Sequence, residues 1–214
     1  MQVYSNNEII LDKLINYLKT NPIRLSKTHS DGRVNSINNE DEIKNKLLEN
    51  NEFRRIIIIP KERFWYDIAL NYEGKFLPIN IKVSNLLNGS ADNCSSKQGM
   101  AYALTGEKYN IPSNWKDFDK FLAKNLKFGY DYYFIVVNKA SPSDCYWTSL
   151  KRINRLTPNG NNLPFQANWA INRTFSGRSE KEAMKYIIEI YLQSWDKKVD
   201  GDPIHLRRII ENWK

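Results

Sequence analysis

Three polar residues, Asp67, Asn80 and Lys82, have the types and the spacing that are needed to handle a divalent cation beside a phosphate. Asp67 interrupts an aromatic and aliphatic stretch, and the other two lie two residues apart in a second such stretch. A carboxylate and an amide oxygen can hold Mg²⁺, which also binds phosphate oxygens. A lysine beside the metal can stabilise charge on the phosphate or help to lower the pKa of a water. The three residues therefore predict a site for Mg²⁺-dependent chemistry on a phosphate.

The two stretches that carry these residues read as the arms of a β-hairpin. Residues 64–72 and 76–83 are rich in strand-forming residues, and a short connection that contains Gly74 joins them. Residues two apart in a strand share a face, and normal pairing lets Asp67 reach the face of the other two polar side chains. A half-exposed structural hairpin with a hydrogen-bonded aspartate and a surface lysine is the alternative that this pattern leaves open.

The order of Asp67 and then Asn80-Ile81-Lys82 resembles the PD-(D/E)xK signature of a superfamily of nucleases. Tyr66 stands in the place of the proline of that signature, and Asn80 stands in the place of its acidic residue. The resemblance implies that Asp67 bridges the metal to the scissile phosphate. It also implies that Asn80 supplies a neutral second ligand and that Lys82 positions or polarises the attacking water.

The composition is that of a globular chain with a basic surface. The 214 residues suit one domain over 1–214, and 41% of them are hydrophobic. Lys and Arg outnumber Asp and Glu by 32 to 24, which leaves a net charge of +8. A basic globular domain favours a polyanionic partner, with nucleic acid as the first expectation.

Cysteine and histidine usage bears on the compartment and on other chemistries. Cys94 and Cys145 lie far apart, and His29 and His205 are the only histidines. A zinc cluster needs about four ligands close together, and neither histidine accompanies a nucleophile motif, so zinc sites and triad hydrolases are disfavoured. Two free thiols favour a reducing compartment. The chain shows neither a secretory signal nor a run of about 20 apolar residues, so we expect a cytoplasmic protein with no membrane partner.

The apolar pattern predicts the elements around the hairpin. Helical spacing predicts helices over 7–19 and 40–50, the second with Asn39 as its cap. The segment 54–60 contains four consecutive isoleucines, which is typical of a strand buried on both faces. After the hairpin we expect a helix near 99–105, a helix over 114–127 and a buried strand over 132–138.

This succession of a helix, three strands, a helix and a strand is the αβββαβ core order of the PD-(D/E)xK nucleases, whose metal site lies on the second and third strands. The expected fold class is therefore α/β, in an α+β arrangement with a mixed sheet. Its expected form is a restriction-endonuclease-like αβββαβ core with flanking helices.

The C-terminal part of the chain resembles that of blunt-cutting type II restriction endonucleases of the EcoRV and HincII kind. A short strand and a basic segment are expected over 146–155, a polar strand over 163–175, a helix capped by Ser179 over 179–197, and a short basic helix over 204–214. Those enzymes also follow the lysine with a polar loop that enters the DNA groove. Asn and Arg side chains suit adenine and guanine edges. A polar edge strand is the alternative for 163–175. The expected DNA contacts are Ser84, Asn85, Asn93, Ser95, Ser96, Lys97, Gln98, Asn168, Asn172, Arg173 and Arg178.

The sequence therefore leads us to expect a type II, site-specific endodeoxyribonuclease that hydrolyses phosphodiester bonds of double-stranded DNA with Mg²⁺. A palindromic target would require a homodimer, and a restriction–modification system would supply a cognate DNA methyltransferase. Whether an upstream helix adds a carboxylate to the site stays open, with Glu42 and Glu8 as the two candidates. Two alternatives stay open: a catalytically weak or inactive nucleic-acid-binding module of the same fold, and a structure-specific repair nuclease or resolvase.

Overall fold

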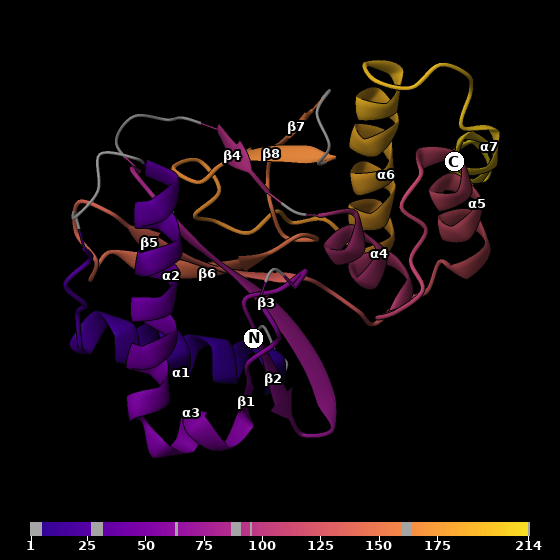
Figure 1. Ribbon diagram of the computed structural model, residues 1–214. Coiled ribbons are helices and arrows are strands. Elements are labelled where there is room, and N and C mark those ends of the chain that lie inside the picture. The colour runs from indigo at the N-terminus through magenta and orange to yellow at the C-terminus, as the bar shows by residue number, and fades with distance from the viewer. Residues whose placement is uncertain are drawn as a thin grey trace. The chain divides into compact units, whose positions relative to one another are not determined.

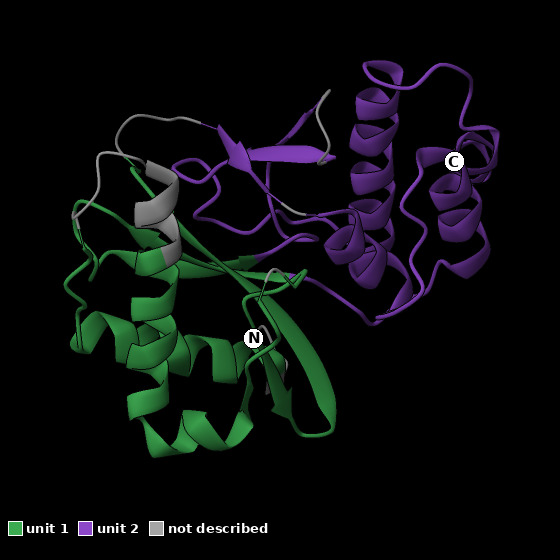
Figure 2. Cartoon of the chain, viewed as in Figure 1, with its two compact units in different colours: residues 1–90, 133–148 green, residues 91–132, 149–214 purple. Residues whose placement is uncertain are grey.

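The computed structural model describes residues 6–26, 32–62, 64–86, 91–94, 96–159 and 164–213. The chain divides into two compact units, which Figure 2 shows in different colours. Unit 1 comprises Met1–Ser90 and Tyr133–Thr148, and unit 2 comprises Ala91–Tyr132 and Ser149–Lys214. The chain thus leaves unit 1 after its hairpin region and returns to it for two further strands. The expectation of a single domain over 1–214 stays a prediction.

Unit 1 is built on a five-stranded mixed sheet. Its elements are α1 (Asn6–Thr20), α2 (Gly32–Glu49), α3 (Asn51–Ile56), β1 (Ile57–Ile58), β2 (Ile68–Tyr72), β3 (Lys75–Ser84), β5 (Tyr133–Asn138) and β6 (Cys145–Ser149). The strand order is β1-β2-β3-β5-β6, and Figure 1 shows the three helices gathered beside the sheet. β1, β2 and β3 pair antiparallel, whereas β3 and β5 pair parallel. The predicted α/β class with a mixed sheet is confirmed.

The two faces of β3 differ in what they carry. Ile79 and Ile81 are fully buried in a hydrophobic core that also contains Leu14 of α1. The residues between and beyond them, Asn80 and Lys82, project from the opposite face because side chains alternate along a strand. Burial of the isoleucines therefore sets the register that places the two polar residues together on one face.

The turn between β2 and β3 is one residue shorter than the connection 73–75 that the sequence predicts, because Lys75 already belongs to β3. Glu73 and Gly74 form it, with φ angles of 49° and 73°, and Tyr72 pairs with Lys75 at the end of the ladder. Positive φ at both positions matches the twist of antiparallel strands, and Gly74 adopts it without a steric penalty. The predicted hairpin is confirmed, with its first strand shortened to five residues.

The second helix begins earlier than predicted. α2 starts at Gly32, so Asn39, which was expected to cap it, lies inside the helix and is only 1% exposed. The predicted cap is wrong because a cap preference acts only where the chain enters a helix, and here the preceding residues are already helical.

The run of four isoleucines is not a strand buried on both faces. The Asn50 side chain accepts hydrogen bonds from two backbone N–H groups, at 2.9 and 3.3 Å, and starts α3, which ends at Ile56. β1 then holds two residues at the edge of the sheet, and Ile58 and Ile59 are exposed. The N-cap therefore overrides the strand preference of the β-branched residues.

Unit 2 contains four helices and a small sheet among its described residues. Its elements are β4 (Ala91–Asn93), α4 (Lys97–Thr105), α5 (Trp115–Asn125), β7 (Leu156–Pro158), β8 (Phe165–Asn168), α6 (Glu180–Asp196) and α7 (Ile204–Asn212). The sheet has the order β4-β8-β7 with antiparallel pairs. Trp115 of α5 stacks on Tyr191 of α6, with ring centroids 5.2 Å apart. None of the helices in the described ranges is long and apolar enough to cross a membrane.

The helices of unit 2 lie close to the ranges that the sequence predicts for them. The capping box between Ser179 and Glu182 is present at the start of α6. Asn114 caps α5 by accepting a hydrogen bond from the Asp117 N–H at 2.8 Å. These starts were predictable because a cap and its partner lie within four residues of each other. The strands β4 and β7, which pair only with the distant β8, were not predicted.

Candidate active site

Asp67 lies immediately before β2, at the point where the two strands of the hairpin part. Its backbone N–H donates to the Ile79 carbonyl oxygen at 3.0 Å, and the register of the ladder places it across from Asn80. Its carboxylate Oδ2 accepts a hydrogen bond from the Ile81 N–H at 2.6 Å. The side chain thus takes the place of a main-chain partner just before β2 begins. The sheet therefore brings Asp67 to the strand that carries the other two predicted site residues.

Asn80 carries one of the eight side-chain polar atoms that are buried without a hydrogen-bond partner among the described residues. Its side chain is half-buried, and its Oδ1 is buried without a hydrogen-bond partner among the described residues. A buried acceptor that makes no hydrogen bond costs about 1–3 kcal/mol, so such groups are rare and call for a reason. Such a reason would be a bound cation, or a hydrogen-bond donor of the substrate, that gives this amide oxygen its missing partner.

Burial raises the pKa of the Asp67 carboxyl above its ordinary value. The hydrogen bond from the Ile81 N–H and the positive charges of Lys82 and Lys44 oppose this increase, while the charge of Asp41 adds to it. Lys82 is thus one of the charges that favour the ionised form of this carboxylate. A bound cation would act in the same direction as the two lysines and favour the charged form.

Helix α2 adds a second set of polar groups beside Asp67. A cleft of about 650 Å³ lies between α2 and the chain that precedes β2, and Asp67 lines it. Asp41 and Lys44 of α2 also line the cleft, and their side chains form an ion pair at 3.0 Å. Sequence reasoning missed both residues. Their spacing with Leu48 marks one helical face, so the periodicity that predicted the helix could have revealed them.

The two upstream glutamates are not brought to Asp67. Glu42 accepts a hydrogen bond from the Ser26 N–H at 3.0 Å and another from the Ser26 hydroxyl, which ties it to the segment before α2. Glu8 lies nearly buried in the first turn of α1. Neither lines the cleft, whereas Glu40 and Asp41 of α2 do, so α2 brings other carboxylates to the cleft than the predicted one.

The donors at the hairpin suit one class of metal better than another. Within the described ranges, no three His, Cys, Asp or Glu side chains gather closely enough to hold a metal ion. Asp67 and Asn80 offer one charged and one neutral oxygen. Mg²⁺ accepts oxygen ligands and keeps several waters, whereas structural zinc prefers four protein ligands that include nitrogen or sulfur. The donor set, with its unpartnered amide oxygen, therefore fits Mg²⁺.

Two of the expected DNA contacts have structural tasks instead. Asn172 is fully buried, and its amide exchanges hydrogen bonds with the Arg155 backbone, both at 3.0 Å, and donates to the Asn168 carbonyl oxygen at 2.8 Å. Arg178 donates to two backbone carbonyl oxygens at 2.9 and 3.0 Å, and its guanidinium lies 3.8 Å from the centroid of the Tyr186 ring. Both side chains hold the loop between β8 and α6, so we remove them from the set of DNA-reading candidates.

Two further candidates are also engaged at the start of α4. Ser96 caps the helix by accepting a hydrogen bond from the Gly99 N–H at 3.1 Å. The Lys97 ammonium donates to the Ser113 carbonyl oxygen and lies 5.3 Å from the centroid of the Trp115 ring. Burial, together with the nearby charge of another lysine, lowers the pKa of Lys97. These contacts stabilise unit 2 and leave neither group free to read a base.

The remaining candidates differ in exposure. Ser84 is buried, and the Asn168 oxygen accepts a hydrogen bond from the Ala170 N–H at 3.0 Å. Ser95 lies outside the described residues. The exposed members of the set are Asn85, Asn93, Gln98 and Arg173. These four remain candidates for contacts with DNA.

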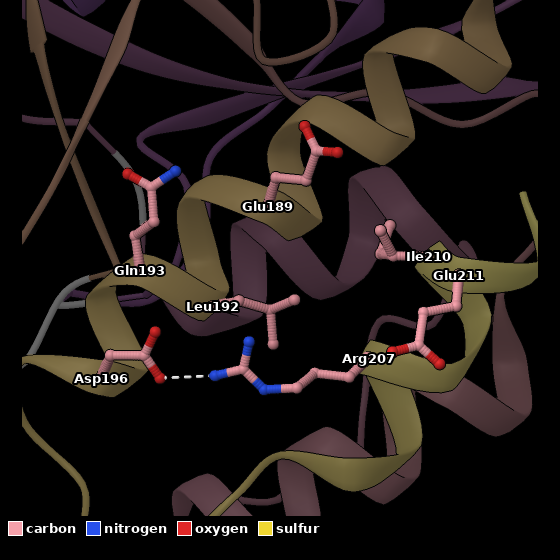
Figure 3. A pocket seen from close by; sticks show the side chains of 7 residues that line it. All are labelled: Glu189, Leu192, Gln193, Asp196, Arg207, Ile210 and Glu211. Atoms are coloured by element: carbon pink, nitrogen blue, oxygen red, sulfur yellow. Dashed lines mark hydrogen bonds and ion pairs between the residues drawn. The ribbon is translucent and has the colours of Figure 1, made fainter. Parts of the chain in front are cut away.

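A groove in unit 2 has a different chemical character. It has a volume of about 310 Å³ and lies between α6 and α7 (Figure 3). Arg207 extends across it and donates to Asp196 at 2.7 Å, and also to Asp202 at 2.5 Å. Glu189 and Glu211 add further carboxylates to the lining. An acidic groove whose arginine is already paired does not suit a phosphate, so phosphate chemistry is better served at the hairpin.

No family model matches this chain, and no curated protein matches it in sequence. A functional assignment therefore depends on the chemistry that the side chains of the hairpin can support.

Proposed function

We propose that this protein is a Mg²⁺-dependent endodeoxyribonuclease that hydrolyses phosphodiester bonds at a short sequence in double-stranded DNA, as a type II restriction enzyme does. Asp67, Asn80 and Lys82 are its catalytic residues. The observation that carries the proposal concerns Asp67 and Asn80. The backbone of β3 holds the Asp67 carboxylate, and across from it lies the buried amide oxygen of Asn80, which lacks a partner among the described residues. Lys82 adds a positive charge that acts on the same carboxylate.

The strand arrangement around the site supports the same proposal. β1, β2 and β3 pair antiparallel and β5 pairs parallel with β3, an order of strands in keeping with the αβββαβ succession expected of a restriction-endonuclease-like core. Asp67 stands at the start of the second strand, and Lys82 stands on the third. The net charge of +8 favours association with a polyanion such as DNA.

Each residue of the site has one task in the reaction. Asp67 and Asn80 would hold Mg²⁺, which supplies positive charge to the phosphate oxygens and lowers the pKa of a bound water. Lys82 donates a hydrogen bond to the attacking water and stabilises the negative charge that develops on the phosphate. The Ile81 N–H fixes the carboxylate of Asp67, so this group is already oriented before DNA arrives.

A digestion of long duplex DNA tests the proposal. Wild-type protein and Asp67→Asn are incubated with phage-sized DNA at several Mg²⁺ concentrations, with a chelator as the control. Discrete bands from the wild type alone are the expected result. Cutting that needs junctions or damaged ends would instead identify a structure-specific repair nuclease or resolvase. Absence of cutting at every Mg²⁺ concentration would remove the nuclease proposal.

One observation favours a second candidate, a catalytically weak or inactive nucleic-acid-binding module. Asn80 is neutral, and an amide is a weaker ligand for a hard cation than a carboxylate is. Such a module would bind duplex DNA with a steep loss of affinity as salt increases, because bound lysines and arginines displace counterions. Binding of that kind without cutting would decide for this candidate.

The assembly and the compartment belong to the same proposal. A palindromic target calls for two active sites related by a two-fold axis, and so for a homodimer on DNA. Light scattering of the protein with a cut-site duplex measures this stoichiometry. Cys94 and Cys145 are both buried and form no disulfide among the described residues, in keeping with the reducing cytoplasm in which a cognate DNA methyltransferase would protect the host DNA.

A further inference from the structure

The cleft beside Asp67 has one aromatic wall. Phe64 and Tyr66 line it, and their rings meet edge to face with centroids 5.0 Å apart. Trp65 packs against Tyr66 at 4.8 Å and also lies near Phe76 at 6.4 Å. Phe64 is nevertheless 41% exposed, so a packed cluster holds a ring that still presents surface to solvent. A fixed and exposed aromatic ring is a surface on which a flat ligand can stack.

Among the described residues, the charged side chains that line the cleft are mostly acidic, although the chain as a whole is basic. Glu40, Asp41 and Lys44 line it from α2, and Lys61, Glu62 and Asp67 line it from the segment that also carries Phe64. Apart from Asp67, which would hold Mg²⁺ at the scissile phosphate, three carboxylates and two ammonium groups of the described lining offer no net positive charge to a further phosphate. Carboxylates do accept hydrogen bonds from amino groups, and they need no opposite charge to do so. The lining therefore suits a flat, uncharged ligand that carries an amino group.

We infer that this cleft binds an unpaired nucleobase with an exocyclic amino group, stacked on Phe64 and hydrogen-bonded to carboxylates of the lining. The inference rests on the proposed function, and it specifies the substrate: the base belongs to the nucleotide next to the phosphate that Asp67 contacts. A cleft of about 650 Å³ falls within the range of small-ligand sites. Adenine, cytosine and guanine carry the required amino group, whereas thymine does not.

This arrangement has a consequence for DNA. A base inside a duplex cannot reach the cleft, so it must leave the stack, at a cost that is smallest where it is mismatched or already unpaired. Stacking on an aromatic side chain contributes about 1–3 kcal/mol per base and offsets part of that cost. DNA with an unpaired cytosine is therefore a better ligand than the same strand with thymine in that position.

The test measures binding without divalent cations, so that cleavage plays no part. Labelled single strands of twelve cytosines or twelve thymines are titrated with the protein in the presence of a chelator, and fluorescence anisotropy gives the dissociation constants. The wild type is expected to bind the cytosine strand more tightly than the thymine strand. Phe64→Ala should weaken binding by about tenfold or more. Phe128→Ala is the matched control, because Phe128 is 54% exposed but lies outside the lining of the cleft, and it should leave both constants unchanged.

Two further variants separate loss of the site from loss of the fold. Phe64→Leu keeps an apolar side chain in the cluster but removes the aromatic face, so it should fold normally and bind as weakly as Phe64→Ala. Glu62→Gln removes one carboxylate charge of the lining and should reduce the preference for cytosine, whereas Glu73→Gln at the exposed hairpin turn should not. Equal affinities for the two strands, or wild-type affinity in Phe64→Leu, would overturn the inference.

The outcome is distinguishable from that of the nuclease test. Cleavage of DNA with Mg²⁺ by a Phe64→Leu protein that also binds both strands as the wild type does would leave the nuclease proposal intact and remove the base site. Base-selective binding by a wild-type protein that never cuts would retain the base site and remove the nuclease.

Discussion

Asn80 of unit 1 and Asn172 of unit 2 are both amides in protected surroundings, but their hydrogen bonding is opposite. Asn172 is fully buried, and its oxygen and nitrogen make three hydrogen bonds to the backbone. The Oδ1 of Asn80 is buried and makes none to the described residues. Satisfied buried amides stabilise a fold, whereas an unsatisfied one costs stability. Polar residues that the sequence assigns to a site can therefore be divided into structural and functional groups by the hydrogen bonds that their atoms already make.

The same contrast separates the two lysines that the sequence linked to DNA. Lys97 is held by a carbonyl oxygen and an aromatic ring in unit 2. The positive charge of Lys82, in unit 1, acts to lower the pKa of the Asp67 carboxyl. We therefore assign Lys97 a structural role and Lys82 a role in the reaction. Four predictions can break or sharpen this distinction.

The largest expected effect is on cleavage. Lys82→Ala should slow hydrolysis by about 100-fold or more, because it removes a donor aimed at the reacting phosphate, and DNA affinity should change little. Single-turnover cleavage and binding to the same duplex measure the two effects. Lys75→Ala is the matched control, since Lys75 lies exposed at the start of the same strand. Normal cutting by the Lys82→Ala protein would show that the hairpin is not the active site.

The next effect is on stability and involves unit 2. Asn172→Ala leaves a buried N–H and two carbonyl oxygens without their partner, so the free energy of unfolding should fall by about 2–4 kcal/mol. Urea unfolding measures this change. Asn212→Ala, at an exposed position in α7, should stay within about 0.5 kcal/mol of the wild type. A stable Asn172→Ala protein with altered DNA specificity would return Asn172 to the DNA-reading set.

A smaller effect concerns the affinity for Mg²⁺ at Asn80. Asn80→Asp should lower the Mg²⁺ concentration for half-maximal effect by about tenfold, because hard cations prefer anionic oxygen, and Asn80→Ala should raise it by a similar factor. The readouts are the Mg²⁺ dependence of cleavage and the Mg²⁺-dependent increase in Tm, which needs no catalysis. Three superimposable titrations would show that Asn80 is not a ligand and would reduce the catalytic set to Asp67 and Lys82.

The smallest effect is the pH dependence of stability at Asp67. Because the folded-state pKa is raised by burial, this carboxyl contributes most favourably below its unfolded-state value, and that contribution is lost as the pH rises through the folded-state pKa. Asp67→Asn keeps an oxygen that can accept the Ile81 N–H but carries no charge. It should therefore be more stable than the wild type at pH 7, by a margin that shrinks towards pH 4. Urea unfolding at both pH values checks this, and a destabilised variant at pH 7 would indicate a purely structural carboxylate.

The sequence by itself determined the features that depend on near neighbours. The hairpin turn follows from Glu73 and Gly74, which adopt positive φ, and the alternation around Ile79 and Ile81 places Asn80 on the opposite face. Helix starts such as the capping box of α6 were also predictable. In each case the interacting groups lie within a few residues of one another, so periodicity and cap chemistry are sufficient.

Only the tertiary structure decided which groups are already occupied. Asn172 and Arg178 looked like DNA-reading side chains until their backbone partners, some 17 and 25 residues away in sequence, were visible. The same holds for the cleft, where Lys44 of α2 lines the same space as Asp67, from which it is distant in sequence. Side-chain type sets what a group can bind, but long-range packing sets what it does bind, and no local pattern records that choice.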